Sequence, residues 1–326
     1  MAQSERLIEV WRGEFLECFH SGHAVVVDTS GQMVDAWGDP EKVLLPRSSC
    51  KMIQALPLVE SGAADAIGLT PEHLALACSS HQSESYHLAM VEAWLAEIGL
   101  DDTALRCGTV LPHDLETRKT LHKTDSSPCQ IHNECSGKHT GFLTLARHLD
   151  AGPEYIDVHH PVQRACLEAL ERMTGVVSPG HAIDGCAAPN FATTLTGLAR
   201  AMAMFAGAAE TSAAGRLRDA MRRHPQFVAG TGKATTELMQ AMDGHAAIKT
   251  GAEGVFTAIL PEEGLGIAIK IDDGASRASA AACAALLIKY GALNPDHPLT
   301  LRTLNGPILN RRGMPTGKIN AAPGFG

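Results

Sequence analysis

The sequence predicts an α/β fold in which strands from the two ends of the chain form one antiparallel sheet. Three observations support this prediction. Apolar runs separated by short turns occur near both ends, helical patterns fill the middle, and no fixed-period repeat or low-complexity linker divides the chain. The simplest arrangement pairs the terminal strands and covers the sheet with helices. A chain of 326 residues is long enough for this, so we expect one unit over residues 1–326.

Two hairpin patterns predict the strands. HAVVVDTSGQMVDAW contains a Ser30-Gly31 turn between two apolar runs, and GVFTAILPEEGLGIAIKID repeats this pattern near the C-terminus. The expected strands are Val25–Val27, Met33–Trp37, 247–251, Val255–Leu260 and Leu265–Ile271. The sheet-forming parts are therefore expected at about 20–45 and 245–290.

Helical periodicity dominates the region from about 46 to 244. The expected helices there are Lys51–Glu60, Ser85–Ile98, Gly141–His148, Pro161–Met173, Phe191–Phe205 and Ala234–Met242. An alanine-rich helix over Ser276–Tyr290 follows the last predicted strand. We therefore expect helices to cover the faces of the sheet.

Composition and charge exclude several classes of function. Hydrophobic residues make up 45% of the chain, enough for a substantial core, and the net charge of −9 disfavours nucleic-acid binding. The N-terminus, MAQSERLIEVWRGEF, carries charges throughout and does not resemble a secretory segment. The most apolar stretch, Ala278–Ile288, is too short to span a bilayer. We expect a cytoplasmic protein without a nucleic-acid or membrane partner.

The chain has nine cysteines, an odd number with no secretion signal. This usage predicts reduced thiols rather than a disulfide framework. Each cysteine is by default a small buried side chain, so metal binding or catalysis needs a separate argument.

Three short motifs occur in an order that indicates chemistry. Ser48 and Lys51 form an S-x-x-K pair at helical spacing, followed by apolar residues that predict a buried helix. The polar stretch CSSHQSE at 78–84 follows, and its serines are also compatible with an ordinary helix N-cap. K-T-G stands at 249–251, on the predicted sheet. This order is typical of serine penicillin-recognising enzymes, although Ser80-His81-Gln82 replaces their S-D-N motif.

The stretch NECSGKHTGF at 133–142 has two interpretations as a metal site. The first is a compact zinc knot with the spacing C-x2-H-x2-C-x3-H, formed by Cys129, His132, Cys135 and His139. The second joins Cys135 and Lys138 or His139 with Cys186 from the remote stretch IDGCAAPNF, in which Asp184 binds or orients. Spacing does not decide between them, and free buried thiols remain a third interpretation.

Longer blocks carry a resemblance to a known family. PRSSCKMIQALPL, CSSHQSE, NECSGKHTGFL, DGCAAPNFATTL and KTGAEGVFTAILPE together resemble the class 3, or rhizobial-type, L-asparaginases, over about residues 20–290. The resemblance implies a serine β-lactamase-like fold, a single catalytic unit, a zinc ion and a homodimer. It also implies hydrolysis of L-asparagine to L-aspartate and ammonia.

The resemblance implies a role for each matching residue. The implied catalytic residues are Ser48, Lys51, Ser80 and Lys249. The implied zinc ligands are Cys135, Lys138 and Cys186, and Arg47, His139 and Asp184 are the expected substrate-binding residues. A glutaminase or another small amide hydrolase on the same fold is an alternative. A non-enzymatic, zinc-dependent amino-acid-binding protein is an alternative of a different class.

Overall fold

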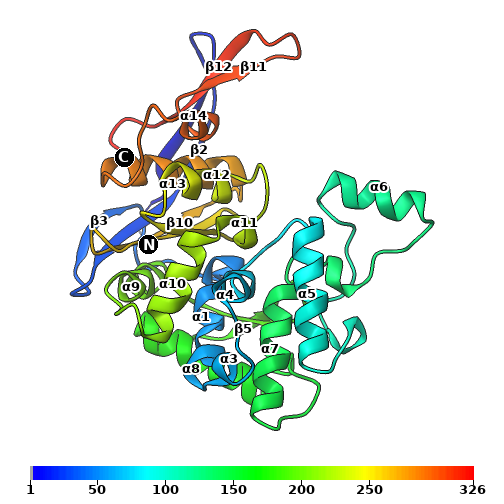
Figure 1. Ribbon diagram of the computed structural model, residues 1–326. Coiled ribbons are helices and arrows are strands. Elements are labelled where there is room, and N and C mark those ends of the chain that lie inside the picture. Colours follow the sequence, from blue (N-terminus) through cyan, green and yellow to red (C-terminus); the bar gives the residue numbers. More distant parts are fainter. Residues whose placement is uncertain (1–2) are drawn as a thin grey trace.

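The computed structural model describes residues 3–326 and contains an eight-stranded antiparallel sheet with helices packed against it (Figure 1). The strand order is β11-β12-β1-β2-β10-β9-β8, and β3 pairs with β2. The strands are β1 (Glu5–Arg12), β2 (Phe15–Asp28), β3 (Met33–Trp37), β8 (Ala247–Thr250), β9 (Val255–Leu260), β10 (Leu265–Ile271), β11 (Pro307–Leu309) and β12 (Pro315–Ala321). The predicted fold class is therefore confirmed.

The long strand β2 joins the two ends of the chain. Its first half pairs with β1, whereas its second half pairs with β10 on one side and β3 on the other. In the register with β10, Val26 lies opposite Ile267, and both side chains are fully buried. This pairing is the contact between terminal strands that the sequence predicted.

Helices cover the sheet and form a separate group beside it. The helices are α1 (Lys51–Gln54), α2 (Leu56–Glu60), α3 (Ala63–Ala66), α4 (Pro71–Ala77), α5 (Ser85–Glu97), α6 (Leu115–Lys123), α7 (Ser136–His148), α8 (Pro161–Thr174), α9 (Leu195–Ala206), α10 (Ala213–Arg223), α11 (Pro225–Val228), α12 (Ala234–Ala241), α13 (Ser276–Lys289) and α14 (Pro298–Thr303). Both faces of β9 are buried, with α9 and α13 packed on the sheet. Among residues 3–326, no helix is long and apolar enough to cross a membrane.

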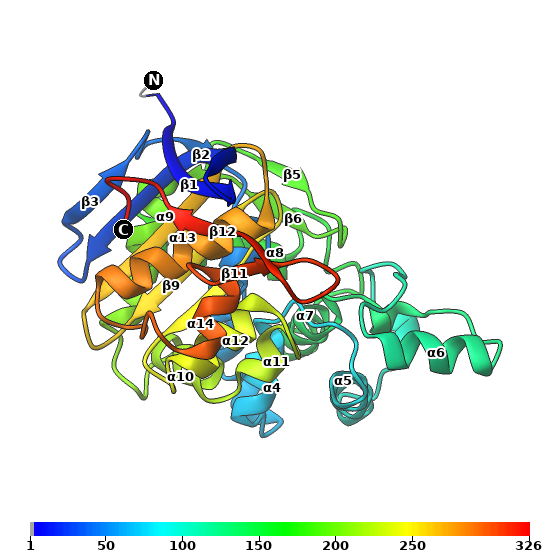
Figure 2. The same cartoon turned by 90° about the horizontal axis from the view of Figure 1, so that it is seen from above.

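Helix α9 approaches the sheet closely because β10 has a glycine at the contact. A Cβ atom on Gly266 would lie 2.0 Å from the backbone nitrogen of Ala203, so any side chain would displace the helix. Helix α6, in contrast to α9, projects from the body of the protein beside α5, as two perpendicular views show (Figures 1 and 2).

Several predicted boundaries need correction. The helix expected at Lys51–Glu60 is interrupted at Ala55, because Pro57 near the start of α2 has no N–H for a helical bond to the preceding turn. The helix expected from Gly141 begins at Ser136, and the one expected from Phe191 begins at Leu195. The sheet also extends beyond 20–45 and 245–290, since β1, β11 and β12 belong to it.

Candidate active site

Ser48 lies in a short 3-10 helix, η1 (Arg47–Cys50), that leads directly into α1. Its side chain is half-buried, and its hydroxyl makes no hydrogen bond within residues 3–326. Arg47 before it has φ +54°, a left-handed conformation that is unfavourable for a non-glycine residue and is often found at functional sites. The backbone therefore presents Ser48 on a strained turn.

Strand β8 lies against this turn. A Cβ atom on Gly251, the glycine of K-T-G, would be 2.8 Å from the carbonyl oxygen of Pro46, so glycine is needed for the close approach. Thr257 on β9 adds a hydrogen bond of 3.0 Å from its hydroxyl to the carbonyl oxygen of Ser49. The sheet thus fixes the position of Ser48 relative to Lys249.

Lys51 is directed toward Ser80 rather than Ser48. Its Nζ donates to the Ser80 hydroxyl at 3.1 Å and to Cys135 Sγ at 3.2 Å, and it also contacts the carbonyl oxygen of Ser79. The side chain is 1% exposed. Lys51 therefore connects the first serine motif to the second and also contacts Cys135.

Lys249 completes the connection. Its Nζ donates to Ser80 Oγ at 2.8 Å and to the carbonyl oxygen of Thr250 at 2.9 Å. Burial lowers the pKa of Lys249 well below its ordinary value, and the nearby charge of Lys51 lowers it further. A neutral amine at Lys249 can accept a proton from Ser80. The structure thus brings together Lys51, Ser80 and Lys249, whereas Ser48 lies three residues before Lys51 in the turn that leads into α1.

The alternative role of CSSHQSE as a helix cap is wrong. The N-cap of α5 is Glu84, which makes no side-chain capping bond. Ser80 is held by the two lysines, and Ser83 Oγ donates to the carbonyl oxygen of His132 at 2.6 Å. His81 shares a hydrogen bond of 2.8 Å with Ser136. This stretch therefore links the serine centre to the start of α7.

The second group of chemical side chains joins α7 to a remote turn. Cys135 is the N-cap of α7, and Cys186 lies in the turn between β5 (His181–Ile183) and β6 (Pro189–Phe191). Lys138 Nζ donates to Cys186 Sγ at 3.1 Å. All three side chains are buried. The structure therefore brings together the three predicted zinc ligands.

The two thiols in this group differ in acidity. A hydrogen bond from the Cys135 thiol, together with the charge of Lys138, lowers the pKa of Cys186. The same bond and burial raise the pKa of Cys135. Although burial opposes its charge, the two sulfurs raise the pKa of Lys138 above its ordinary value. The group is thus a buried thiolate held by an ammonium and a thiol.

The available donors fit a zinc ion chemically. Thiolates and imidazole nitrogens are common zinc ligands. His139 next to the cluster has a buried Nε2 atom without a hydrogen-bond partner, while its Nδ1 lies 2.9 Å from the Tyr155 hydroxyl. Burial, followed by the charge of Lys138, lowers the pKa of His139 to about 4, so its imidazole is neutral at pH 7.

The compact zinc knot is not present. No group of three or more His, Cys, Asp and Glu side chains in residues 3–326 is arranged as a cation site. Cys129 and His132 instead contact each other, with Sγ and Nδ1 3.4 Å apart. A zinc site formed by Cys135 and Cys186 therefore needs Lys138 as its third ligand.

Arg47 and Asp184 form an ion pair that ties the serine turn to the cysteine turn. Arg47 donates from Nε at 3.0 Å and from a terminal nitrogen at 2.9 Å to the same carboxylate oxygen of Asp184. Asn190 donates to the other oxygen at 3.3 Å. Among the expected substrate-binding residues, these two are already paired, whereas His139 keeps one free nitrogen.

A cavity of about 280 Å³ opens beside Ser80. Gln82, Glu134, Lys233 and Thr250 are among the residues that line it. Neither Glu134 nor Lys233 was predicted from the sequence to be functional. Glu134 stands directly before Cys135, and this position beside a predicted ligand was the signal available in the sequence.

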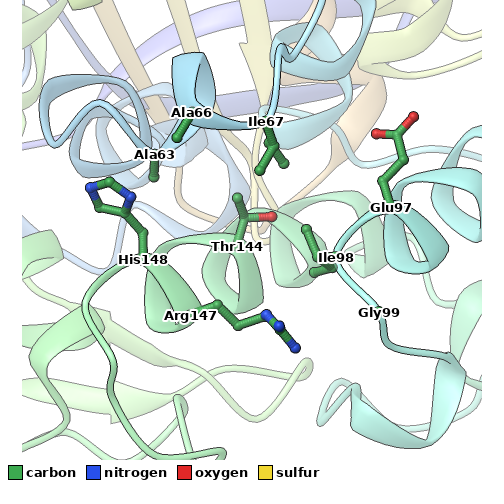
Figure 3. Close-up of a pocket in the computed structure, with 9 residues that line it drawn as sticks. All are labelled: Ala63, Ala66, Ile67, Glu97, Ile98, Gly99, Thr144, Arg147 and His148. Carbon is green, nitrogen blue, oxygen red and sulfur yellow. The ribbon is translucent and has the colours of Figure 1, made fainter.

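Figure 3 shows a different pocket, which lies away from this chemistry. It is lined by Ala63 and Ala66 of α3, by the end of α5, and by Thr144, Arg147 and His148 of α7. Those α7 residues are at the C-terminal end of the helix, whereas Cys135 and Lys138 are at its start. This pocket contains none of the predicted site residues.

The family model described as L-asparaginase II matches residues 8–321. The chain therefore belongs to the L-asparaginase II family, whose members act as amidohydrolases on small-molecule amides. This result confirms the asparaginase part of the resemblance, whereas the class 3, rhizobial-type assignment stays a prediction. The comparison with curated protein sequences finds no match.

Solved structures show distant similarity. A β-lactamase from Mycobacterium bovis is 13% identical, with a TM-score of 0.48 over 82% of this chain and 94% of that one. The native form of Mglu is 13% identical, with a TM-score of 0.48 over 85% of this chain and 66% of that one. The octameric penicillin-binding protein homologue from Pyrococcus abyssi is 13% identical, with a TM-score of 0.39 over 90% and 80%.

Proposed function

We propose that this protein is a class 3 L-asparaginase that hydrolyses the side-chain amide of L-asparagine through an acyl-enzyme on Ser48. The observation that carries the proposal is the chain of hydrogen bonds from Lys249 through Ser80 to Lys51, beside the strained turn of Ser48. Membership in the L-asparaginase II family supports the amide substrate.

In the first step, the neutral amine of Lys249 takes a proton from Lys51 through Ser80, and Lys51 then accepts the Ser48 proton as Ser48 Oγ attacks the amide carbon. Backbone amides near Ser48 stabilise the oxyanion. Lys51 then gives this proton to the departing nitrogen, which leaves as ammonia, and Ser80 returns a proton from Lys249 to Lys51. The low pKa of Lys249 supports this role because a neutral amine is available to take part in the relay. Water attacks the acyl-enzyme, releases L-aspartate and restores the Ser48 hydroxyl.

Zinc is part of this proposal. Cys135, Lys138 and Cys186 would hold the ion, and Lys138 must lose its proton to bind. A bound zinc would supply positive charge for substrate placement and leave a coordination position open, since three protein ligands do not close a tetrahedral site. His139 faces the cluster with its free Nε2. Arg47, oriented by Asp184, retains N–H groups that can bind the substrate carboxylate.

The decisive assay compares ammonia release from L-asparagine, L-glutamine and β-aspartyl dipeptides. Turnover of asparagine well above the other two supports the proposal, and preferred turnover of glutamine supports the glutaminase alternative. Asparagine binding without turnover of any amide would instead support the non-enzymatic alternative. The family resemblance also implies a homodimer, which light scattering can distinguish from the 34.4 kDa monomer.

A further inference from the structure

Glu134 lines the cavity beside Ser80 with a carboxylate that has no partner. Its Oε2 atom is buried and makes no hydrogen bond. Within residues 3–326, no Lys, Arg or His nitrogen lies within 4.0 Å of either oxygen to form an ion pair. The residue is half-buried overall, but leaving a buried carboxylate oxygen without a hydrogen bond is unfavourable, so this geometry fits a cationic ligand that supplies the missing bond to Oε2.

The backbone of Glu134 is fixed relative to the serine centre. The N–H of His81, the residue after Ser80, donates to the carbonyl oxygen of Glu134 at 3.1 Å. Cys135, the residue after Glu134, accepts a hydrogen bond from Lys51. The Glu134 carboxylate is therefore carried on a segment that is bonded on both sides to the proposed proton relay.

The size and lining of the cavity limit what the cation can be. A volume of about 280 Å³ is at the small end of ligand pockets and suits a single amino acid. Thr250 and Ser276 contribute hydroxyls, and the exposed side chain of Lys233 provides the opposite charge. A cavity that offers both signs of charge is complementary to a zwitterion.

We propose that Glu134 binds the α-ammonium group of the substrate and so restricts this enzyme to amides of α-amino acids. The inference rests on the proposed function, because the amide must reach Ser48 while its ammonium group lies at Glu134. Glu134 then acts in binding and selectivity and takes no part in proton transfer. Its effect on kinetics is confined to substrates that carry the ammonium group.

The test is a substrate-by-variant comparison. Glu134→Gln keeps the shape of the side chain and removes its charge, and succinamic acid is asparagine without the amino group. The KM for L-asparagine should rise by roughly ten- to a hundredfold in the variant, since a charge-assisted bond is lost, whereas kcat/KM for succinamate stays within about twofold. Glu84→Gln is the matched control, because Glu84 is a nearby carboxylate already bonded to Thr231 and Tyr86.

Equal loss on both substrates, or no change on either, would overturn the inference. Calorimetric binding of L-aspartate separates it from the proposed function. If the wild-type protein hydrolyses asparagine and Glu134→Gln leaves KM and aspartate binding unchanged, the Glu134 inference fails alone. If the wild-type protein releases no ammonia but binds aspartate in a Glu134-dependent way, the proposed function fails and the ammonium site stands.

Discussion

Two buried lysines in this protein lie in opposite electrostatic surroundings. Lys249 contacts a hydroxyl and a carbonyl oxygen and lies near the charge of Lys51, and its pKa is lowered. Lys138 contacts Cys186 beside Cys135, and its pKa is raised. Both side chains are almost fully buried, so burial alone does not explain the difference. The charge that each lysine faces decides whether it becomes a base or stays an ammonium.

This difference assigns the two regions separate chemical roles. In the proposed mechanism, the region of Ser48, Lys51, Ser80 and Lys249 supplies an amine whose lowered pKa favours its neutral form. The thiol region has an ammonium that must be displaced before Lys138 can bind a metal. Lys51 joins the two regions, because it donates to Ser80 and to Cys135. A change in the thiol region therefore has a direct route to the serine region.

The largest expected effect is the loss of activity on removing the proposed nucleophile. Ser48→Ala should lower kcat for asparagine by at least about a thousandfold, because no acyl-enzyme can form. The variant should fold normally, since the Ser48 hydroxyl has no hydrogen bond in the described chain. Ser49→Ala serves as the neighbouring control. If Ser48→Ala releases ammonia at a near-normal rate, Ser80 becomes the nucleophile.

The metal prediction tests which side chains bind zinc. We expect Cys135→Ala/Cys186→Ala to lose bound zinc and to weaken asparagine binding, whereas Cys129→Ala/His132→Ala keeps both. The reason is that Cys129 and His132 contact each other and lie outside the Lys138 cluster. Elemental analysis of the purified double variants measures the zinc content. Zinc retained only in the Cys135/Cys186 variant would refute the predicted ligand set.

The pH dependence follows from the lowered pKa of Lys249. Lys249 is neutral above its lowered pKa, so the proposed relay gains its base as pH rises through that value. We expect kcat/KM for asparagine to rise from acid toward alkaline pH, with its optimum at or above neutrality. A measured optimum below about 6 contradicts a lysine base. Lys249→Met should remove this rise together with most of the activity.

Sequence patterns predicted those parts of the fold that local hydrophobicity specifies. The bounds of β9 and β10 match the expected strands, because both lie in an apolar hairpin buried in the sheet. Strand β1 was missed because the charged residues Arg6 and Glu9 interrupt its apolar pattern. These polar groups are accommodated by hydrogen bonds from Arg6 and Trp11 to Glu9, and such pairing exists only after folding.

In the candidate site, too, the sequence did not predict features that form only when distant segments meet on folding. The family resemblance predicted Ser80 and Lys249 as partners, and the structure joins these two residues, which are 169 positions apart, by a hydrogen bond. Glu134 was not identified, because a glutamate in a polar stretch is normally solvated. Its missing partner results from how the cavity is assembled from distant segments, and no local pattern encodes that.

The smallest expected effect is on the melting temperature, which we compare between variants of the two lysines. Lys249→Met removes an amine that the fold already holds with a lowered pKa, so its melting temperature at pH 7 should change by less than about 2 °C. Lys138→Met removes the cation that faces the low-pKa thiol of Cys186, so the metal-free protein should melt about 5 °C lower.

Linkage theory gives the direction in which each lysine's contribution to the free energy of unfolding changes with pH. Lys249 binds fewer protons when folded than when unfolded, so its wild-type contribution to stability becomes more favourable as pH rises toward the ordinary lysine pKa. For Lys138 the folded pKa is raised, so its contribution is present below that ordinary value and is lost as pH rises through the folded pKa. Calorimetry between pH 7 and about 10, on each variant against the wild type, measures both contributions. That of Lys249 should become more favourable across this range, whereas that of Lys138 should stay level, because its loss begins only above the ordinary lysine pKa. The same pH dependence in both variants would show that the two lysines do not differ in their electrostatic surroundings.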